Sequence, residues 1–148
     1  MTLHGSAVAL DGEGILLLAP PGSGKSDLVL RLLEGGWRLV ADDQVALRRS
    51  GDALLAAPPP ALAGMLELRG LGLVSGLAWA EAPLHLVARL QPEEAIPRLP
   101  SPETWEADGV RLPLVALDGR AASAPARLRA ALDVARGRLG MVAGALAA

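Results

Sequence analysis

The chain has 148 residues, of which 51% are hydrophobic, and its 16 acidic and 14 basic side chains leave a net charge of −2. This length and composition predict a single domain, residues 1–148, with a hydrophobic core of its own. The charge lacks the excess of basic residues typical of nucleic-acid binding, and the absence of cysteine excludes disulfides, thiolate zinc sites and thiol catalysis.

The first third of the chain predicts short strands and one helix. Ser6–Leu10 is typical of a strand, and the turn residues Asp11–Gly14 lead into a fully apolar strand at Ile15–Ala19. A glycine-rich loop follows. Leucine and valine at helical spacing then predict a helix over Ser26–Glu34, and Arg38–Ala41 is expected to be another short buried strand.

The remaining two thirds predict further strands, a long loop and a C-terminal helix. Strands are expected at Val45–Arg49, Ala53–Ala57, Leu84–Leu90 and Val110–Leu117. Gln91–Glu106 contains four prolines and is expected to be a long loop, whereas Glu67–Gly76 has no clear assignment. The apolar pattern over Pro125–Leu139 predicts an amphipathic helix.

No targeting or membrane signal is visible in the sequence. The N-terminus lacks the charged and apolar regions of a signal peptide, and no apolar run has the length of a membrane span. We therefore expect a cytoplasmic protein with no membrane partner.

The most informative segment reads Ala-Pro-Pro-Gly-Ser-Gly-Lys-Ser and contains the only lysine of the chain, Lys25. It follows the phosphate-binding P-loop pattern, with alanine in the first glycine position, and lies between a predicted strand and a predicted helix. Its backbone N–H groups would hold phosphates, Lys25 would reach the β- and γ-phosphates, and Ser26 would bind Mg²⁺. The predicted nucleotide-binding residues are Ala19, Pro20, Pro21, Gly22, Ser23, Gly24, Lys25 and Ser26. The plainer alternative is a glycine-rich turn with a surface lysine.

Two adjacent acids, Asp42 and Asp43, follow the strand after this helix. One carboxylate at such a position can hold Mg²⁺ or its water, and the other can accept a proton from an attacking hydroxyl. A solvated turn at the end of a strand is the alternative interpretation.

Two further motifs complete a resemblance. His4-Gly5 lies 21 residues before Lys25, and residues 66–73 read Leu-Glu-Leu-Arg-Gly-Leu-Gly-Leu. With the Arg-Leu-Val-Ala-Asp-Asp stretch at Arg38–Asp43, this set resembles the C-terminal catalytic domain of bacterial HPr kinase/phosphorylase, in a short form without the N-terminal domain of longer members. The resemblance extends from His4 to about Leu90. It implies an α/β fold: a P-loop kinase core of the HPr kinase/PEP carboxykinase-like type, with a mixed sheet flanked by helices and a C-terminal helix.

The resemblance also implies an activity, cofactors and a partner. The expected enzyme is an ATP- and Mg²⁺-dependent serine kinase that phosphorylates an HPr-like phosphocarrier protein and so regulates carbohydrate metabolism through the phosphotransferase system. Phosphorolytic removal of the same phosphate and assembly into a homo-oligomer are properties of the longer members. They stay open here, because the segment Leu114–Ala121 lacks a proline and one arginine of the family's dephosphorylation segment. Arg120 lies within that segment.

Site residues follow from the resemblance one by one. Asp43 would take the proton from the substrate serine, and Asp42 would support the metal or its water. His4 and Lys25 would lie at the phosphates, and Arg98 is the candidate for the family's mobile-loop arginine. The family signature segment falls on Glu67, Arg69, Gly70 and Gly72, and Glu67 would be a second Mg²⁺ ligand alongside Ser26 and Asp42.

Two other functions remain open at this point. The chain has a size suited to a P-loop kinase of a small metabolite, although the signature segment favours a protein substrate. A nucleotide-sensing module with little turnover is the alternative from another class, favoured by Ala19 and by the altered Leu114–Ala121 segment.

Overall fold

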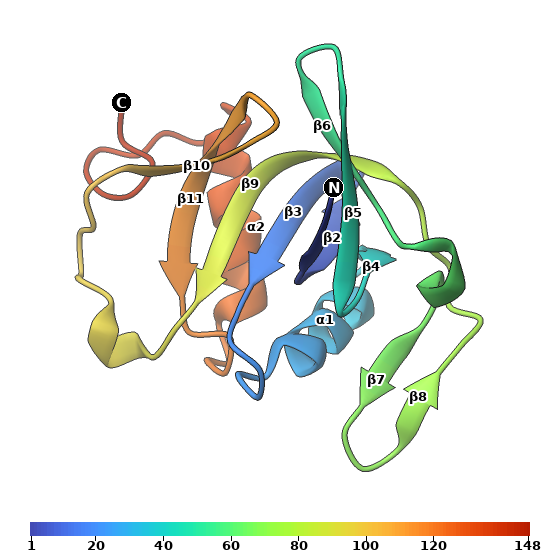
Figure 1. Cartoon of the computed structure of the whole chain (residues 1–148). Helices are drawn as coiled ribbons and strands as arrows, with labels where there is room; N and C mark the ends of the chain where they lie inside the picture. Colours follow the sequence, from blue (N-terminus) through green and yellow to red (C-terminus); the bar gives the residue numbers. More distant parts are fainter.

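The computed structural model describes residues 1–148 and shows a curled, mainly antiparallel sheet with two helices (Figure 1). The elements in chain order are β1 (Thr2–His4), β2 (Ser6–Leu10), β3 (Glu13–Leu18), α1 (Lys25–Glu34), β4 (Arg38–Ala41), β5 (Gln44–Ser50), β6 (Ala53–Ala57), β7 (Leu66–Leu68), β8 (Gly72–Val74), β9 (Ala82–Leu90), β10 (Glu103–Ala107), β11 (Val110–Leu117) and α2 (Ala124–Ala135). Two single-turn 3-10 helices, η1 (Pro60–Leu62) and η2 (Glu93–Ala95), lie in the connections.

Three parallel strands bring distant loops to one edge of the sheet. The strand order is β1-β5-β6-β9-β3-β2-β4, and β9 also pairs with β11. Both β3 and β11 run parallel to β9, with Leu18 opposite Arg89 and Leu117 opposite Leu90. Because the carboxyl ends of parallel strands meet at one edge, the segments that follow β3, β9 and β11 are neighbours there.

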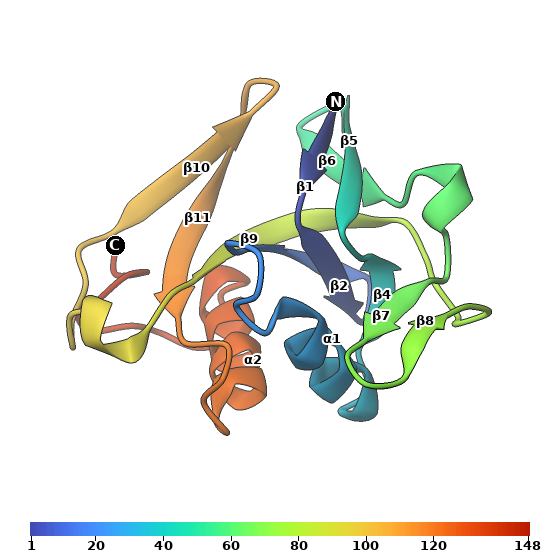
Figure 2. The ribbon, with the colours of Figure 1, turned by 60° about the horizontal axis from the view of Figure 1, so that its bottom comes forward.

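The sheet separates two apolar clusters because side chains alternate along each strand. In β3, Ile15 and Leu17 face one cluster, together with Leu28 of α1 and Leu128 of α2, while Leu16 faces the other. Figure 2 shows both helices beneath the same face of the central strands. The mixed sheet and the C-terminal helix are therefore as expected, with the helices on one face of the sheet.

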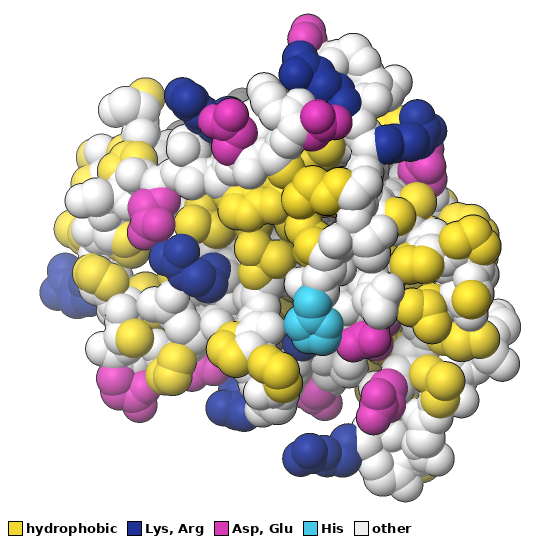
Figure 3. All heavy atoms as spheres, viewed as in Figure 1, with side chains coloured by type: hydrophobic (Ala, Val, Ile, Leu, Met, Phe, Trp, Pro, Cys, Tyr) yellow, Lys and Arg dark blue, Asp and Glu magenta, His cyan; other side chains and the backbone are white.

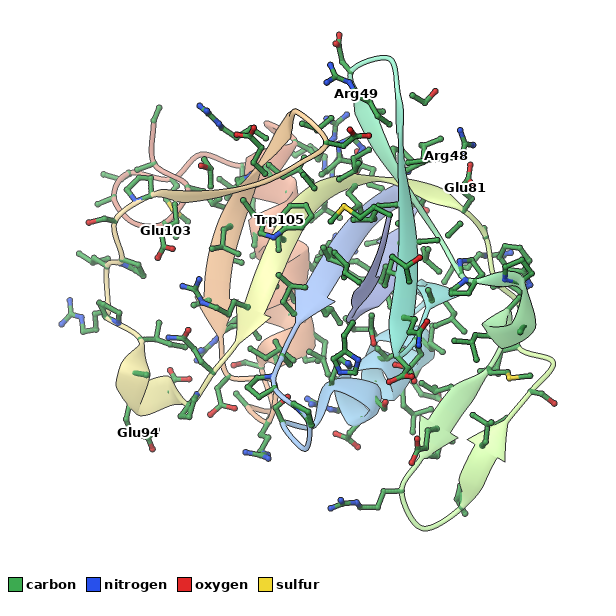
Figure 4. All side chains as sticks on the ribbon, viewed as in Figure 1. Arg48, Arg49, Glu81, Glu94, Glu103 and Trp105 are labelled. Atoms are coloured by element: carbon green, nitrogen blue, oxygen red, sulfur yellow. The ribbon has the colours of Figure 1, made fainter.

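The opposite face forms a hollow between two hairpins. Figure 3 shows apolar side chains gathered between the β5–β6 hairpin and the β10–β11 pair. Trp105 of β10 points into this hollow in Figure 4 and packs against the second apolar cluster. Curling of the sheet therefore buries apolar surface on the face that no helix covers.

Several predicted boundaries are confirmed, and two predictions were wrong. The strands Ser6–Leu10, Arg38–Ala41, Ala53–Ala57 and Val110–Leu117 have the predicted bounds. The predicted loop Gln91–Glu106 was wrong at its end, since Glu103–Ala107 forms β10 and pairs with β11 through an Asp-Gly turn. The C-terminal helix stops at Ala135, short of Leu139, because Arg138 and Leu139 both donate backbone hydrogen bonds to the Asp133 carbonyl.

The unassigned segment Glu67–Gly76 contains a small hairpin. β7 and β8 form a separate two-stranded sheet, with Glu67 opposite Leu73. Gly70 lies in its turn and Gly72 begins β8, and their φ angles are 87° and 127°. The hairpin lies beside α1 (Figure 2). Neither helix of the protein has the length and apolar character needed to cross a membrane.

Candidate active site

The predicted P-loop joins β3 to α1, and two of its glycines have positive φ angles. Gly22 and Gly24 have φ angles of 78° and 83°, a conformation that side chains other than glycine disfavour. The Ser23 hydroxyl donates to the Pro20 carbonyl at 2.7 Å and so fixes the width of the loop. The backbone N–H groups of Gly22, Ser23 and Gly24 donate no hydrogen bond within the protein. They are therefore free to hold an anion at the start of α1.

Ala19 occupies the first glycine position of the motif without strain. Its φ is not among the positive values in the chain, and its methyl group packs against the core cluster beneath the helices. An alanine is therefore compatible with the entry to this loop.

His4 lies between Lys25 and Asp43. Its Nε2 is 3.4 Å from the Lys25 ammonium nitrogen, and its Nδ1 is 3.6 Å from a carboxylate oxygen of Asp43. The neighbouring Gly5 lets the backbone beside His4 lie close to β3. A Cβ on Gly5 would be only 2.9 Å from the Leu17 carbonyl oxygen. Lys25 forms no ion pair with any carboxylate, so its charge is available to a ligand.

Asp42 is a buried carboxylate without a cationic partner in the protein. It is 6% exposed and accepts hydrogen bonds from the Ser6 hydroxyl at 2.6 Å and from the Ser26 hydroxyl at 3.2 Å. Burial of a carboxylate without a compensating cation is unfavourable. A divalent cation beside Ser26 would supply that compensation, so the donor set here fits Mg²⁺.

Asp43 has a different environment although it is the next residue. Its side chain is 65% exposed, and its φ is 71°, a value uncommon outside glycine. The Asp43 carbonyl accepts from the Gly5 N–H at 3.1 Å, which holds this backbone against the start of β2. The bend therefore directs the two adjacent carboxylates to different places, one inward to Ser26 and one outward to His4.

The other predicted site residues are not joined to this group. Glu67 and Arg69 are exposed on the β7–β8 hairpin, and Arg98 is exposed between η2 and β10. None of the three forms a hydrogen bond or ion pair with the P-loop, His4 or the aspartates. The protein has no cluster of three or more acidic or histidine side chains placed to hold a metal ion. Their predicted roles, including that of Glu67 as a metal ligand, stay predictions.

One protein-family model matches the first half of this chain. The model of the family "HPr Serine kinase C-terminal domain" matches residues 1–78, more than half of the chain. The chain belongs to this family. The matched residues include every predicted site residue except Arg98.

Relatives and a solved structure agree with the assignment. HPr kinase/phosphorylase from Clostridium botulinum (strain Eklund 17B / Type B) is 43% identical over 72 residues, and that from Shouchella clausii (strain KSM-K16) is 45% identical over 74 residues. Each match covers 49% of this chain and 24% of the relative, so the chain matches about a quarter of the length of these relatives. The structure of the Hpr(Ser) kinase/phosphatase from Coxiella burnetii matches with a TM-score of 0.81 and 22% identity, over 93% of this chain and 97% of that chain. This likeness shows a shared fold that includes the residues beyond 78.

A pocket of about 230 Å³ lies beside the P-loop of this family member. Its walls come from the segments that follow the three parallel strands: Pro20–Ser23 after β3, Leu90–Pro92 at the end of β9, and Asp118–Arg120 after β11. Arg120 donates a hydrogen bond to the Gly22 carbonyl at 2.7 Å, and its backbone N–H donates to Asp118 at 2.9 Å.

Sequence reasoning missed two polar residues around the loop, Ser6 and Arg31, and it named Arg120 only as part of the segment that resembles the family's dephosphorylation segment. Ser6, which supports Asp42, is the one polar residue of a strand that is otherwise apolar, and that exception was a usable signal. Arg31 carries no comparable signal, because arginines are common in this chain and usually cover a solvated surface. The contacts of Arg31 and Arg120 depend on the way β11 and α1 meet in three dimensions.

Proposed function

We propose that this chain is an ATP- and Mg²⁺-dependent serine kinase domain that phosphorylates an HPr-like phosphocarrier protein. The observation that carries the proposal is the position of His4 between Lys25 and Asp43 at the end of a phosphate-binding loop. Membership of the HPr serine kinase family and relatives named HPr kinase/phosphorylase support the choice of substrate.

The residues divide into phosphate binding and proton transfer. The three free N–H groups of the loop and the Lys25 ammonium would bind the phosphates, and Ser26 and Asp42 would hold the metal ion. A bound Mg²⁺ would neutralise the charge that develops on the β- and γ-phosphates. The exposed Asp43 carboxylate would accept the proton of the attacking serine hydroxyl, and His4 would orient it. Most of the rate enhancement would come from positioning and charge neutralisation.

The test is incubation of the protein with γ-labelled ATP, Mg²⁺ and an HPr-type protein. We expect label on a serine of that protein, and its loss when Asp43 is replaced by asparagine. ATP binding without any labelled serine, across several HPr-type proteins, would refute the kinase assignment. Phosphorolysis is tested in the same system by adding inorganic phosphate to the labelled product and measuring the release of pyrophosphate.

A nucleotide-sensing module with little turnover is the second candidate. The observation that favours it is the separation of Glu67 and Arg98 from the P-loop, which leaves the catalytic group without a second acid ligand and without a loop arginine. Nucleotide-dependent capture of the HPr-type protein, with no phosphoserine formed, would favour this function over the kinase.

A further inference from the structure

Arg31 lies in the last turn of α1, and its guanidinium group donates hydrogen bonds to the loop that follows β11. Its Nη1 donates to the Ala121 carbonyl at 3.1 Å, and its Nη2 donates to the Gly119 carbonyl. Its Nε donates to Asp27 at 3.0 Å, one turn earlier on the same helix, which fixes the plane of the guanidinium group. The Arg31 side chain is 29% exposed, and its contacts with the two carbonyls are partly buried, whereas its contact with Asp27 is exposed to water.

The loop held by Arg31 has little room to find another conformation. Gly119 is buried, and a Cβ on it would lie 3.0 Å from Leu90 and 3.5 Å from Leu28. The Gly119 carbonyl accepts no hydrogen bond other than that of Arg31. Loss of the guanidinium group would leave this carbonyl unpaired, which destabilises the loop in its present position.

The same loop carries Arg120 to the P-loop. Arg120 donates to the Gly22 carbonyl at 2.7 Å. Because the peptide bond between Gly22 and Ser23 is trans, its C=O and N–H groups point in opposite directions. The hydrogen bond from Arg120 therefore turns the Ser23 N–H away from Arg120, and this N–H is one of the three that have no partner in the protein.

We propose that Arg31 is a positioning residue for the phosphate-binding loop and that it acts through Arg120. Arg31 fixes the loop after β11, that loop presents Arg120 to the Gly22 carbonyl, and the resulting peptide orientation directs the Ser23 N–H to a bound phosphate. This inference rests on the proposed function, because it assumes that the loop binds a nucleotide. Through Arg31, α1 would help to shape the P-loop that precedes it.

The test compares the unmodified chain with Arg31→Met, Arg120→Met and the double variant, by calorimetric titration with Mg-ADP. Each single variant is expected to weaken binding about tenfold, because a misplaced binding group loses most of its contribution. If Arg31 acts through Arg120, the double variant binds no more weakly than Arg120→Met alone. A purely structural role of Arg31 would instead give losses that multiply.

Two further variants separate positioning from general destabilisation. Arg31→Lys retains the positive charge but replaces three donor nitrogens by one, so it is expected to restore part of the binding lost in Arg31→Met. The matched control is Arg48→Met. Arg48 pairs with Glu81 at 2.8 Å, away from the P-loop (Figure 4), so this substitution is expected to leave binding unchanged.

Limited trypsin digestion reports on the loop without any nucleotide. Cleavage after Arg120 is expected to accelerate in Arg31→Met, whereas cleavage after the exposed Arg98 is expected to be unchanged. Unchanged Mg-ADP binding in Arg31→Met, or multiplied losses in the double variant, would overturn the inference while leaving the proposed function intact. Absence of Mg-ADP binding by the unmodified protein would overturn the proposed function and the inference together.

Discussion

Replacement of Lys25 by arginine separates phosphate binding from folding. The Lys25 ammonium nitrogen lies 3.4 Å from His4 Nε2 and forms no ion pair, so little folding free energy depends on it. We expect the free energy of unfolding to change by no more than about 0.5 kcal/mol. In a protein of this size, that corresponds to a shift of the melting temperature of about 2 °C or less.

Phosphoryl transfer should respond very differently to Lys25→Arg. The guanidinium group is planar and wider than an ammonium, and His4 already occupies one side of the Lys25 nitrogen. A displacement of the positive charge by about 1 Å is expected to lower the rate about 100-fold. This factor corresponds to about 2.7 kcal/mol of transition-state stabilisation.

The assay is a single-turnover transfer from γ-labelled ATP to an HPr-type protein, beside a thermal melt of the same samples. Arg48→Lys is the matched control, because it exchanges the same two residue types at an exposed pair with Glu81. A Lys25→Arg protein with more than half of the original rate would refute the argument that the loop grips phosphate through this side chain. A fall of the melting temperature by more than about 5 °C would show that Lys25 is structural instead.

Further variants test the aspartates, Ser6 and a remote ion cluster. Asp43→Asn should lower phosphoryl transfer about 10²- to 10⁴-fold and leave the dissociation constant of Mg-ADP unchanged, and a parallel loss of binding would contradict its role as a proton acceptor. Asp42→Asn should raise the Mg²⁺ concentration needed for half-maximal rate about tenfold or more, since it removes a charge-assisted contact, and an unchanged Mg²⁺ dependence would count against the metal site. Ser6→Ala should lower the free energy of unfolding in urea by about 1.5–3 kcal/mol, because the hydroxyl bonds a buried carboxylate, and a smaller loss would mean that Asp42 is solvated. Hydrogen bonds from Arg138 and Arg136 lower the pKa of Glu13 to about 2. The stability that this carboxylate contributes is therefore complete above pH 4.5 and is lost as the pH falls toward 2. In urea melts, Glu13→Gln should lower the free energy of unfolding by about 1–2 kcal/mol at pH 7, after allowance for the exposed arginines. The loss should become progressively smaller below pH 4.5.

Local signals in the sequence account for much of the fold. The apolar run before the P-loop, the helical spacing after it and the turn residues at Asp11-Gly12 each depend on neighbours in the chain, and the strands and the helix there lie where they were predicted. β10 was missed because the prolines that precede it and its own charged residues resemble a loop, and its conformation is stabilised by pairing with β11. The helix end at Ala135 was missed because the apolar pattern continues beyond the last backbone hydrogen bonds of the helix.

The candidate site likewise has a part that the sequence predicted and a part that it did not. The P-loop, the acid pair and the histidine were recognisable in the sequence because residue type and spacing define them. The sequence did not show which aspartate faces which partner. That depends on the positive φ of Asp43, with which Asp42 faces Ser26 and Asp43 faces His4. The positions of Glu67 and Arg98 likewise depend on the course of a hairpin and a loop that no local pattern specifies.

By itself, the amino-acid sequence determined the family, because the P-loop pattern, the acid pair and the segment at residues 66–73 are local motifs defined by residue type and spacing. Only the tertiary structure decided how that loop is held. The parallel pairing of β3, β9 and β11 places Asp118–Arg120 beside residues nearly one hundred positions earlier. There Arg31 contacts the loop after β11, and Arg120 contacts the backbone of the P-loop. Such contacts arise from strand pairing across the sheet, and no spacing along the chain encodes them.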